Sequence, residues 1–165
     1  MIHSDKTKYP ANVIQAIYNR LSDIDVEIPV FQRRLKTDDS IQCIGVYPIR
    51  REIDEKSFEM GNKFGPTIEK YCIGIQLAVK NVDMQQGQAD HLELFELVDD
   101  ILYNDASFRL TLPELSTVSN NSVRRQFMLC GVENVRFLST DFQGDWYYLA
   151  TLEFFVTTSK SYVAQ

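Results

Sequence analysis

The amino-acid sequence predicts a single α+β domain in which two amphipathic helices pack on a mainly antiparallel or mixed β-sheet. Two stretches repeat apolar residues at helical spacing, and several others alternate with the period of two that strands show. The length of 165 residues and the hydrophobic content of 44% lie in the range of one globular domain. We therefore expect one domain over residues 1–165, with 159–165 as a loose tail.

The first predicted helix opens at Tyr9 and Pro10, where proline lacks only an N–H that the first turn leaves unbonded. Its apolar face consists of residues at helical spacing: Val13, Ile14, Ile17 and Leu21. The segments that follow are a short extended stretch over 26–30, a polar loop over 32–40, a strand over 41–49 and a long charged loop over 50–66. Pro48 marks an edge or the end of that strand.

Residues 71–79 alternate clearly and predict a central strand. One side of this strand is large and apolar, whereas the other contains Gly74 and Ala78, small residues that would let a helix lie close to the sheet. The segment 87–104 supplies such a helix, with apolar residues at every third or fourth position: His91, Leu94, Phe95, Val98, Ile101 and Leu102. Its other side is acidic.

The last third of the chain predicts mostly strands. A short strand over 108–112, an exposed loop over 116–122, strands over 126–130 and 132–140, and a final strand over 146–157 follow one another. Gly144 lies between the last two strands, so we expect an antiparallel hairpin there. The final strand has one apolar face, and its other face mixes Glu153 and Phe155 with threonines. We interpret this mixed face as a surface that another chain covers in part.

The three cysteines, Cys43, Cys72 and Cys130, lie far apart inside apolar runs. An odd number without C-x-x-C spacing predicts reduced core residues rather than a disulfide framework or a zinc site. The lysines near the N-terminus precede no apolar signal segment, and no stretch has the roughly 18 apolar residues of a membrane span. We expect a soluble protein made in the cytoplasm.

The net charge of −6 argues against a bulk nucleic-acid binder. Acidic residues accumulate between 83 and 108, where no lysine or arginine occurs, while arginines come in adjacent pairs at 33–34, 50–51 and 124–125. The acidic stretch of one copy could face an arginine pair of another and so steer assembly. The alternative is an acidic helix face that is simply solvated.

Candidate catalytic residues all have structural interpretations. His91 lies on the apolar side of a helix, and His3 lies near the terminus. Asp99 and Asp100 are neighbours and point about 100° apart around a helix. The nearest approach to a metal-dependent nuclease site combines residues of two charged, loop-like segments: Asp38, Asp39, Asp54, Glu55 and Lys56. Residues 61–65 lack the Lys-Ser/Thr of a phosphate-binding loop. We expect no catalytic residue, no cofactor and no metal site.

The helix over 11–21, the strand over 71–79 ahead of the helix over 91–102, and the final strand over 148–156 together resemble one family. It is the family of tail terminator, or tail completion, proteins of long-tailed bacteriophages. The resemblance implies a non-enzymatic structural virion protein that forms a ring, typically a hexamer, on the end of the tail tube. Such a ring stops polymerisation of the tube and joins it to the head connector.

The implied partners are further copies of the chain, the tail tube protein and the head–tail connector proteins. DNA would only pass through the ring, without specific binding, and no membrane is involved. The protein would reside in the tail or neck of the virion after assembly in the host cytoplasm. The candidate contact residues are Arg33, Arg34, Arg50, Arg51, Phe64, Glu93, Glu96, Asp100, Glu153 and Phe155.

Three alternatives remain open. The chain could be another head–tail connector or minor tail protein, which would share the same small α+β architecture. It could also be a metal-dependent nuclease, or a bacterial module that binds an unknown partner.

Overall fold

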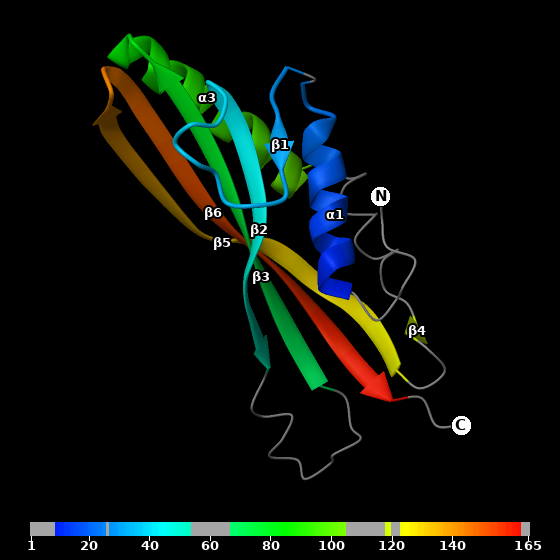
Figure 1. Cartoon of the computed structure of the whole chain (residues 1–165). Coiled ribbons are helices and arrows are strands. Elements are labelled where there is room, and N and C mark those ends of the chain that lie inside the picture. Colours follow the sequence, from blue (N-terminus) through cyan, green and yellow to red (C-terminus); the bar gives the residue numbers. More distant parts are fainter. Residues whose placement is uncertain (1–8, 26, 54–66, 105–117, 120–122, 163–165) are drawn as a thin grey trace.

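A six-stranded sheet forms the centre of the computed structural model, which describes residues 9–25, 27–53, 67–104, 118–119 and 123–162 (Figure 1). The strand order is β1-β2-β3-β6-β5-β4; β1 runs parallel to β2, and all other neighbours are antiparallel. The predicted α+β class with a mixed sheet is therefore confirmed. The elements are α1 (Tyr9–Ser22), β1 (Val30–Phe31), β2 (Gln42–Ile53), β3 (Thr67–Asn81), α3 (Met84–Asn104), β4 (Val118–Ser119), β5 (Val123–Phe142) and β6 (Asp145–Tyr162).

β3 is the central strand that the alternation predicted, because it pairs with β2 on one side and with β6 along its whole length on the other. Its residues Ile75 and Leu77 are fully buried, as are Leu152 and Phe154 of β6. The side chains of both strands meet α1 and α3 in one core. Burial of each large apolar side chain contributes about 1.5–3 kcal/mol, so this layer is the main source of stability.

Both helices lie on the same face of the sheet, which corrects the prediction that α3 packs against the small residues of β3 (Figure 1). α3 packs on the large apolar side instead. The small residues make room for other groups: a Cβ added to Gly74 would lie 2.4 Å from Cζ of Tyr47. We call the side away from the helices the open face.

α3 begins three residues before the predicted start. The Asp83 side chain accepts a hydrogen bond from the backbone N–H of Gln86 at 3.0 Å, and its carbonyl accepts one from Gly87 at 2.9 Å. Asp83 is therefore the N-cap of the helix, a role for which aspartate is among the preferred residues. Gly87 is needed because an added Cβ would lie 2.9 Å from the Tyr148 ring.

β2 is longer than predicted. Residues 50–53, expected in a loop, continue the strand after a bulge between Pro48 and Arg50, while 54–66 lie outside the described residues. The Ile44 N–H points away from β3 and donates to Pro29. By alternation the Pro48 nitrogen also points outward, so the missing N–H removes no bond to β3.

The C-terminal hairpin is confirmed. Its two-residue turn has positive φ at Gln143 (54°) and at Gly144 (86°), as a type I′ turn requires. β5 is one continuous strand with bulges between Phe127 and Leu129 and between Val132 and Asn134, where two strands were predicted. We call the turn end of the sheet the hairpin end and the opposite end the far end.

Three smaller predictions need correction. The segment expected to be extended over 26–30 forms a strand only from Val30, and β1 ends at Phe31. Residues 118–119 form β4 within the stretch predicted as a loop. β6 extends to Tyr162, so the loose tail expected from residue 159 is partly strand. The strand predicted over 108–112 lies outside the described residues.

All three cysteines are free. Cys43 and Cys72 are buried, as predicted for core residues, and Cys130 is half-buried. Burial raises the pKa of the Cys43 thiol to about 11, so this group stays protonated at neutral pH.

Candidate functional site

The open face has two halves that are occupied differently. Near the hairpin end, residues 31–39 cross the sheet, and we call them the cover segment. Leu35 and Phe31 pack on Cys43, Ala78 and Tyr147. The Leu35 N–H donates to Oε1 of Gln76 at 2.9 Å, and the Lys80 ammonium donates to the Thr37 carbonyl at 2.7 Å. The chain itself therefore covers part of the mixed face of β6 for which we expected a partner.

An ion pair closes the cover segment on itself. The Arg33 guanidinium donates to both carboxylate oxygens of Asp39, at 2.9 and 2.7 Å, and lies 4.3 Å from the centre of the Phe31 ring. The Lys36 N–H also donates to Asp39. The hydrogen bonds from Arg33, together with that from Lys36, lower the pKa of Asp39 to about 2. Arg33, a predicted contact residue, is thus bound within its own chain.

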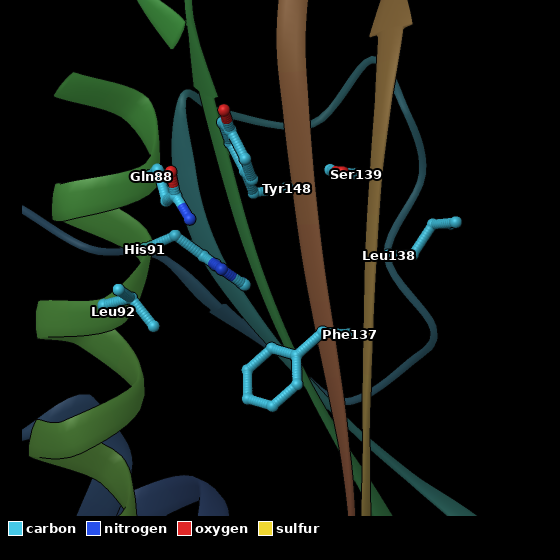
Figure 2. Close-up of a pocket in the computed structure, with 7 residues that line it drawn as sticks. All are labelled: Gln88, His91, Leu92, Phe137, Leu138, Ser139 and Tyr148. Atoms are coloured by element: carbon cyan, nitrogen blue, oxygen red, sulfur yellow. The ribbon is translucent and has the colours of Figure 1, made fainter. Parts of the chain in front are cut away.

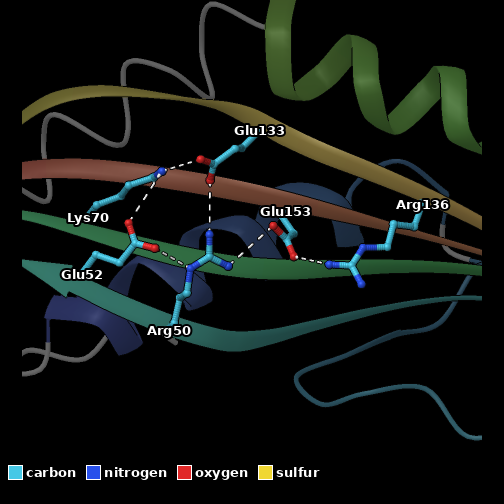
Figure 3. Close-up of polar contacts among 6 residues, drawn as sticks. All are labelled: Arg50, Glu52, Lys70, Glu133, Arg136 and Glu153. Carbon is cyan, nitrogen blue, oxygen red and sulfur yellow. Dashed lines mark hydrogen bonds and ion pairs between the residues drawn. The ribbon is translucent and has the colours of Figure 1, made fainter.

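Charged side chains from four strands occupy the other half of the open face (Figure 3). Arg50 is their centre: its Nε lies 2.6 Å from Glu52, and its terminal nitrogens lie 3.5 Å from Glu133 and 3.6 Å from Glu153. Lys70 lies 2.6 Å from Glu133, and Arg136 lies 3.2 Å from Glu153. We call this group the charged network: Arg50, Glu52, Lys70, Glu133, Arg136 and Glu153.

Charge is balanced inside the charged network, because it holds three cationic and three anionic side chains. The hydrogen bond from Arg50 lowers the pKa of Glu52, and the bond to Glu133 raises the pKa of Lys70. Glu52 and Lys70 therefore both keep their charges at neutral pH. A neutral, mutually bonded group offers little net attraction to a charged partner.

Some of the predicted contact residues pair within their own chain, and others are exposed. Arg50 and Glu153, which we expected to meet residues of other chains, pair with each other, and Lys70 lies 5.1 Å from the centre of the Phe155 ring. Arg34 is exposed, with its guanidinium 4.9 Å from the centre of the Tyr47 ring. Phe64 lies outside the described residues.

Arg51 behaves unlike its neighbour Arg50. It pairs in register with Tyr71, a core residue on the helix side, so its side chain leaves the sheet on the face opposite to the charged network. It is exposed and has no ion-pair partner among the described residues. Glu93, Glu96 and Asp100 are exposed on α3, as predicted for its acidic side.

A pocket of about 230 Å³ lies between α3 and the hairpin (Figure 2). His91 points into it, donates from Nε2 to the Leu77 carbonyl oxygen (3.1 Å), and stacks on Tyr148 with ring centres 5.8 Å apart. Burial lowers the pKa of His91, so the ring is neutral at pH 7. No carboxylate is among the described residues that line this pocket, and the prediction of a core histidine is confirmed.

The strand character of β5 was predicted from the sequence, but its outer position in the sheet was not. β5 exposes large apolar side chains, with Phe137 57% and Leu138 56% accessible, and also Met128 and Leu129. Phe137 leans over α3, with its ring centre 5.2 Å from that of Phe95. Phe137 and Leu138 are consecutive, so in a strand their side chains point to opposite faces. This apolar pair is the feature of the sequence that could have indicated apolar side chains on both faces of β5.

The residues considered for a nuclease site do not form one where they are described. Asp39 is bound to Arg33, and residues 54–56 lie outside the described part of the chain. Within the described ranges, no group of three or more histidine, cysteine or acidic side chains could hold a metal ion. Neither described helix combines the length and the apolar character that crossing a membrane takes.

No protein-family model matches the chain, and no curated protein sequence matches it. Among solved structures, the chain is similar to one from a structure described as the virion of a native gene transfer agent particle. The two chains share 12% identity with a TM-score of 0.49, over 88% of this chain and 93% of the other.

Proposed function

We propose that the protein is a structural, non-enzymatic component of a virion that acts by assembling with copies of itself and with neighbouring virion proteins. The observation that carries the proposal is the outer strand β5. It combines exposed apolar side chains with a backbone edge that, over most of its length, has no partner among the described residues. Edges of this kind pair with other chains unless something protects them.

Within this class we propose a tail terminator: a ring, typically a hexamer, that ends the tail tube, stops its polymerisation and joins it to the head connector. Support comes from the pattern of elements that resembles this family. The structure contains each of these elements: α1, then β3 ahead of α3, and β6 at the end. A ring needs two different surfaces that meet head to tail. Arg51 on one edge of the sheet and the acidic residues of α3 near the other edge are suited to that arrangement.

The first experiment measures the mass of the purified full chain in solution over a range of concentrations, by light scattering and native mass spectrometry. We expect a closed oligomer. The same preparation, incubated with plasmid DNA and Mg²⁺, should leave the DNA intact. A monomer at every concentration that cuts DNA would overturn the proposal in favour of a metal-dependent nuclease.

A second experiment separates the tail terminator from another connector or minor tail protein. The chain is mixed with polymerising tail tube protein, and tube lengths are measured by electron microscopy. A terminator should bind tube ends and shorten the length distribution as its concentration rises. Unchanged lengths with no decoration of the ends would contradict the terminator role.

A further inference from the structure

Both edges of the sheet are open over part of their length. β1 pairs with β2 only at Ile44 and Gly45, and β4 pairs with β5 only at Val123 and Arg124. Among the described residues, no strand therefore covers the outer side of β2 over 46–53 or of β5 over 125–142. β1 lies beside the first residues of β2, near the hairpin end, and β4 lies beside the far end of β5 (Figure 1), so the open part of β2 reaches the far end of the sheet and the open part of β5 reaches the hairpin end.

The two open edges run in opposite directions. β2, β3, β6 and β5 follow one another through three antiparallel pairings, so β5 is antiparallel to β2. A second copy in the same orientation, placed beside the first, brings its β2 alongside β5 as an antiparallel neighbour. Such a contact continues the sheet from one copy into the next and joins two different surfaces.

The backbone groups needed for this pairing point outward. In a two-residue hairpin the residues that flank the turn form a hydrogen-bonded pair, here Phe142 and Asp145. Alternation then directs the N–H and C=O groups of Phe137 and Ser139 away from β6. These groups lie within residues 134–142, a stretch of β5 that no described strand covers and that follows both bulges and contains no proline.

The side chains beside the β5 edge form an apolar and acidic strip. Leu92 of α3 lines the pocket next to Phe137, and the Tyr103 hydroxyl donates to the Val132 carbonyl at 3.2 Å. The helical repeat places Glu96 and Asp99 between these two positions on the same side of α3. Neither carboxylate has an ion-pair partner among the described residues, and burial together with Asp100 raises the pKa of Asp99.

β2 offers the complementary side chains. Arg51 leaves the open part of β2 on the helix side, and Ile53, two residues later, leaves on the same side. An antiparallel neighbour strand on β5 presents its helix-side residues to the strip on α3. Arg51 would then meet the carboxylates, and Ile53 would meet apolar surface, so charge and polarity match between the edges.

We infer that one copy of the chain adds residues 50–53 of β2, which follow Pro48 and the bulge, to the edge of β5 within 134–141 of the next copy, with Arg51 paired to Glu96 and Asp99. This inference rests on the proposed function, because it specifies the contact by which the copies assemble. It assigns different tasks to two adjacent arginines: Arg50 holds the open face together within a chain, and Arg51 joins two chains.

The test measures self-association of the full chain by analytical ultracentrifugation. Arg51→Glu and Glu96→Arg should each weaken association at least tenfold, because each places like charges across the contact. The double variant carrying both changes should recover association to within about threefold of the wild type. Lys36→Glu, an exposed reversal on the cover segment, is the matched control and should associate normally.

A backbone variant provides a second readout. Ser139→Pro removes an outward N–H without touching a bond to β6, so association should fall while the chain remains folded by circular dichroism. Ser139→Ala is its control. If the wild type assembles but Arg51→Glu, Glu96→Arg and Ser139→Pro assemble equally well, the edge contact is wrong and assembly uses another surface. If the wild type itself stays monomeric, the proposed function fails first.

Discussion

The two halves of the open face differ in how they are covered. The hairpin end is packed by the cover segment, whose Leu35 lies against Gly45 and whose Arg33 is bonded to Asp39. The other half has no covering segment among the described residues and carries the charged network. Packing against backbone tolerates little change, whereas exposed ion pairs adjust to solvent and salt. Substitutions in the first half should therefore cost much more stability than those in the second.

The largest effect is expected from Gly45→Ala. An added Cβ would lie 2.6 Å from the Arg33 carbonyl oxygen, so the cover segment must shift. We expect the free energy of unfolding to fall by about 1–3 kcal/mol in urea titrations. Gly131→Ala is the matched control in the other half, because its Cβ would meet only the edge of the Phe155 ring at 3.3 Å. Equal losses in both variants would remove the proposed difference between the halves.

An intermediate effect is expected from acid. The pKa of Asp39 falls from 3.8 to about 2 on folding, so its ion pair stabilises the protein above pH 4 and is lost as the pH drops from 4 to 2. Asp39→Asn should reduce the loss of stability over that range by about 1–2 kcal/mol relative to the wild type. Urea midpoints at both pH values measure this difference. Parallel acid profiles would show that Asp39 does not anchor the cover segment.

The smallest effect is expected in the charged network. Arg50→Gln removes the contacts to three carboxylates, yet Arg50 itself is exposed, as are Glu52 and Glu133, so unfolding should become easier by less than about 1 kcal/mol. Salt at about 0.5 M should abolish most of that difference. Arg51→Gln should leave stability unchanged while it weakens association. A large loss for Arg50→Gln that persists in salt would mean that this half is packed as firmly as the other.

The sequence predicted the elements whose character is set by periodicity. α1, β3 and the hairpin follow from apolar repeats and from a glycine at the turn, and all three are confirmed. The strand character of 50–53 was missed because its charged residues look like a loop when read alone. Their partners are Lys70, Glu133 and Glu153, which lie far away in sequence and become neighbours only through strand order.

The same limit applies to the candidate site. Arg50 and Glu153 were predicted as contacts to other chains, whereas in the structure they pair with each other. The sequence does not distinguish a partner in the same chain from one in another chain. The cover segment was predicted as a polar loop, and nothing local indicates that Leu35 lies over Gly45. The β5 edge escaped prediction because a strand is known to be outermost only once the order β6-β5-β4 is known.

The bulge between Val132 and Asn134 has a consequence for how the open face could vary. It inserts one residue, Glu133, so that two successive side chains of β5 project toward the same side while the pairing with β6 resumes in step on both flanks. Deleting Glu133 would remove its ion pairs with Lys70 and Arg50 without shifting the rest of the hairpin. Insertion or deletion of this single bulge residue would therefore add or remove one carboxylate on the open face, with every neighbouring amino acid left unchanged.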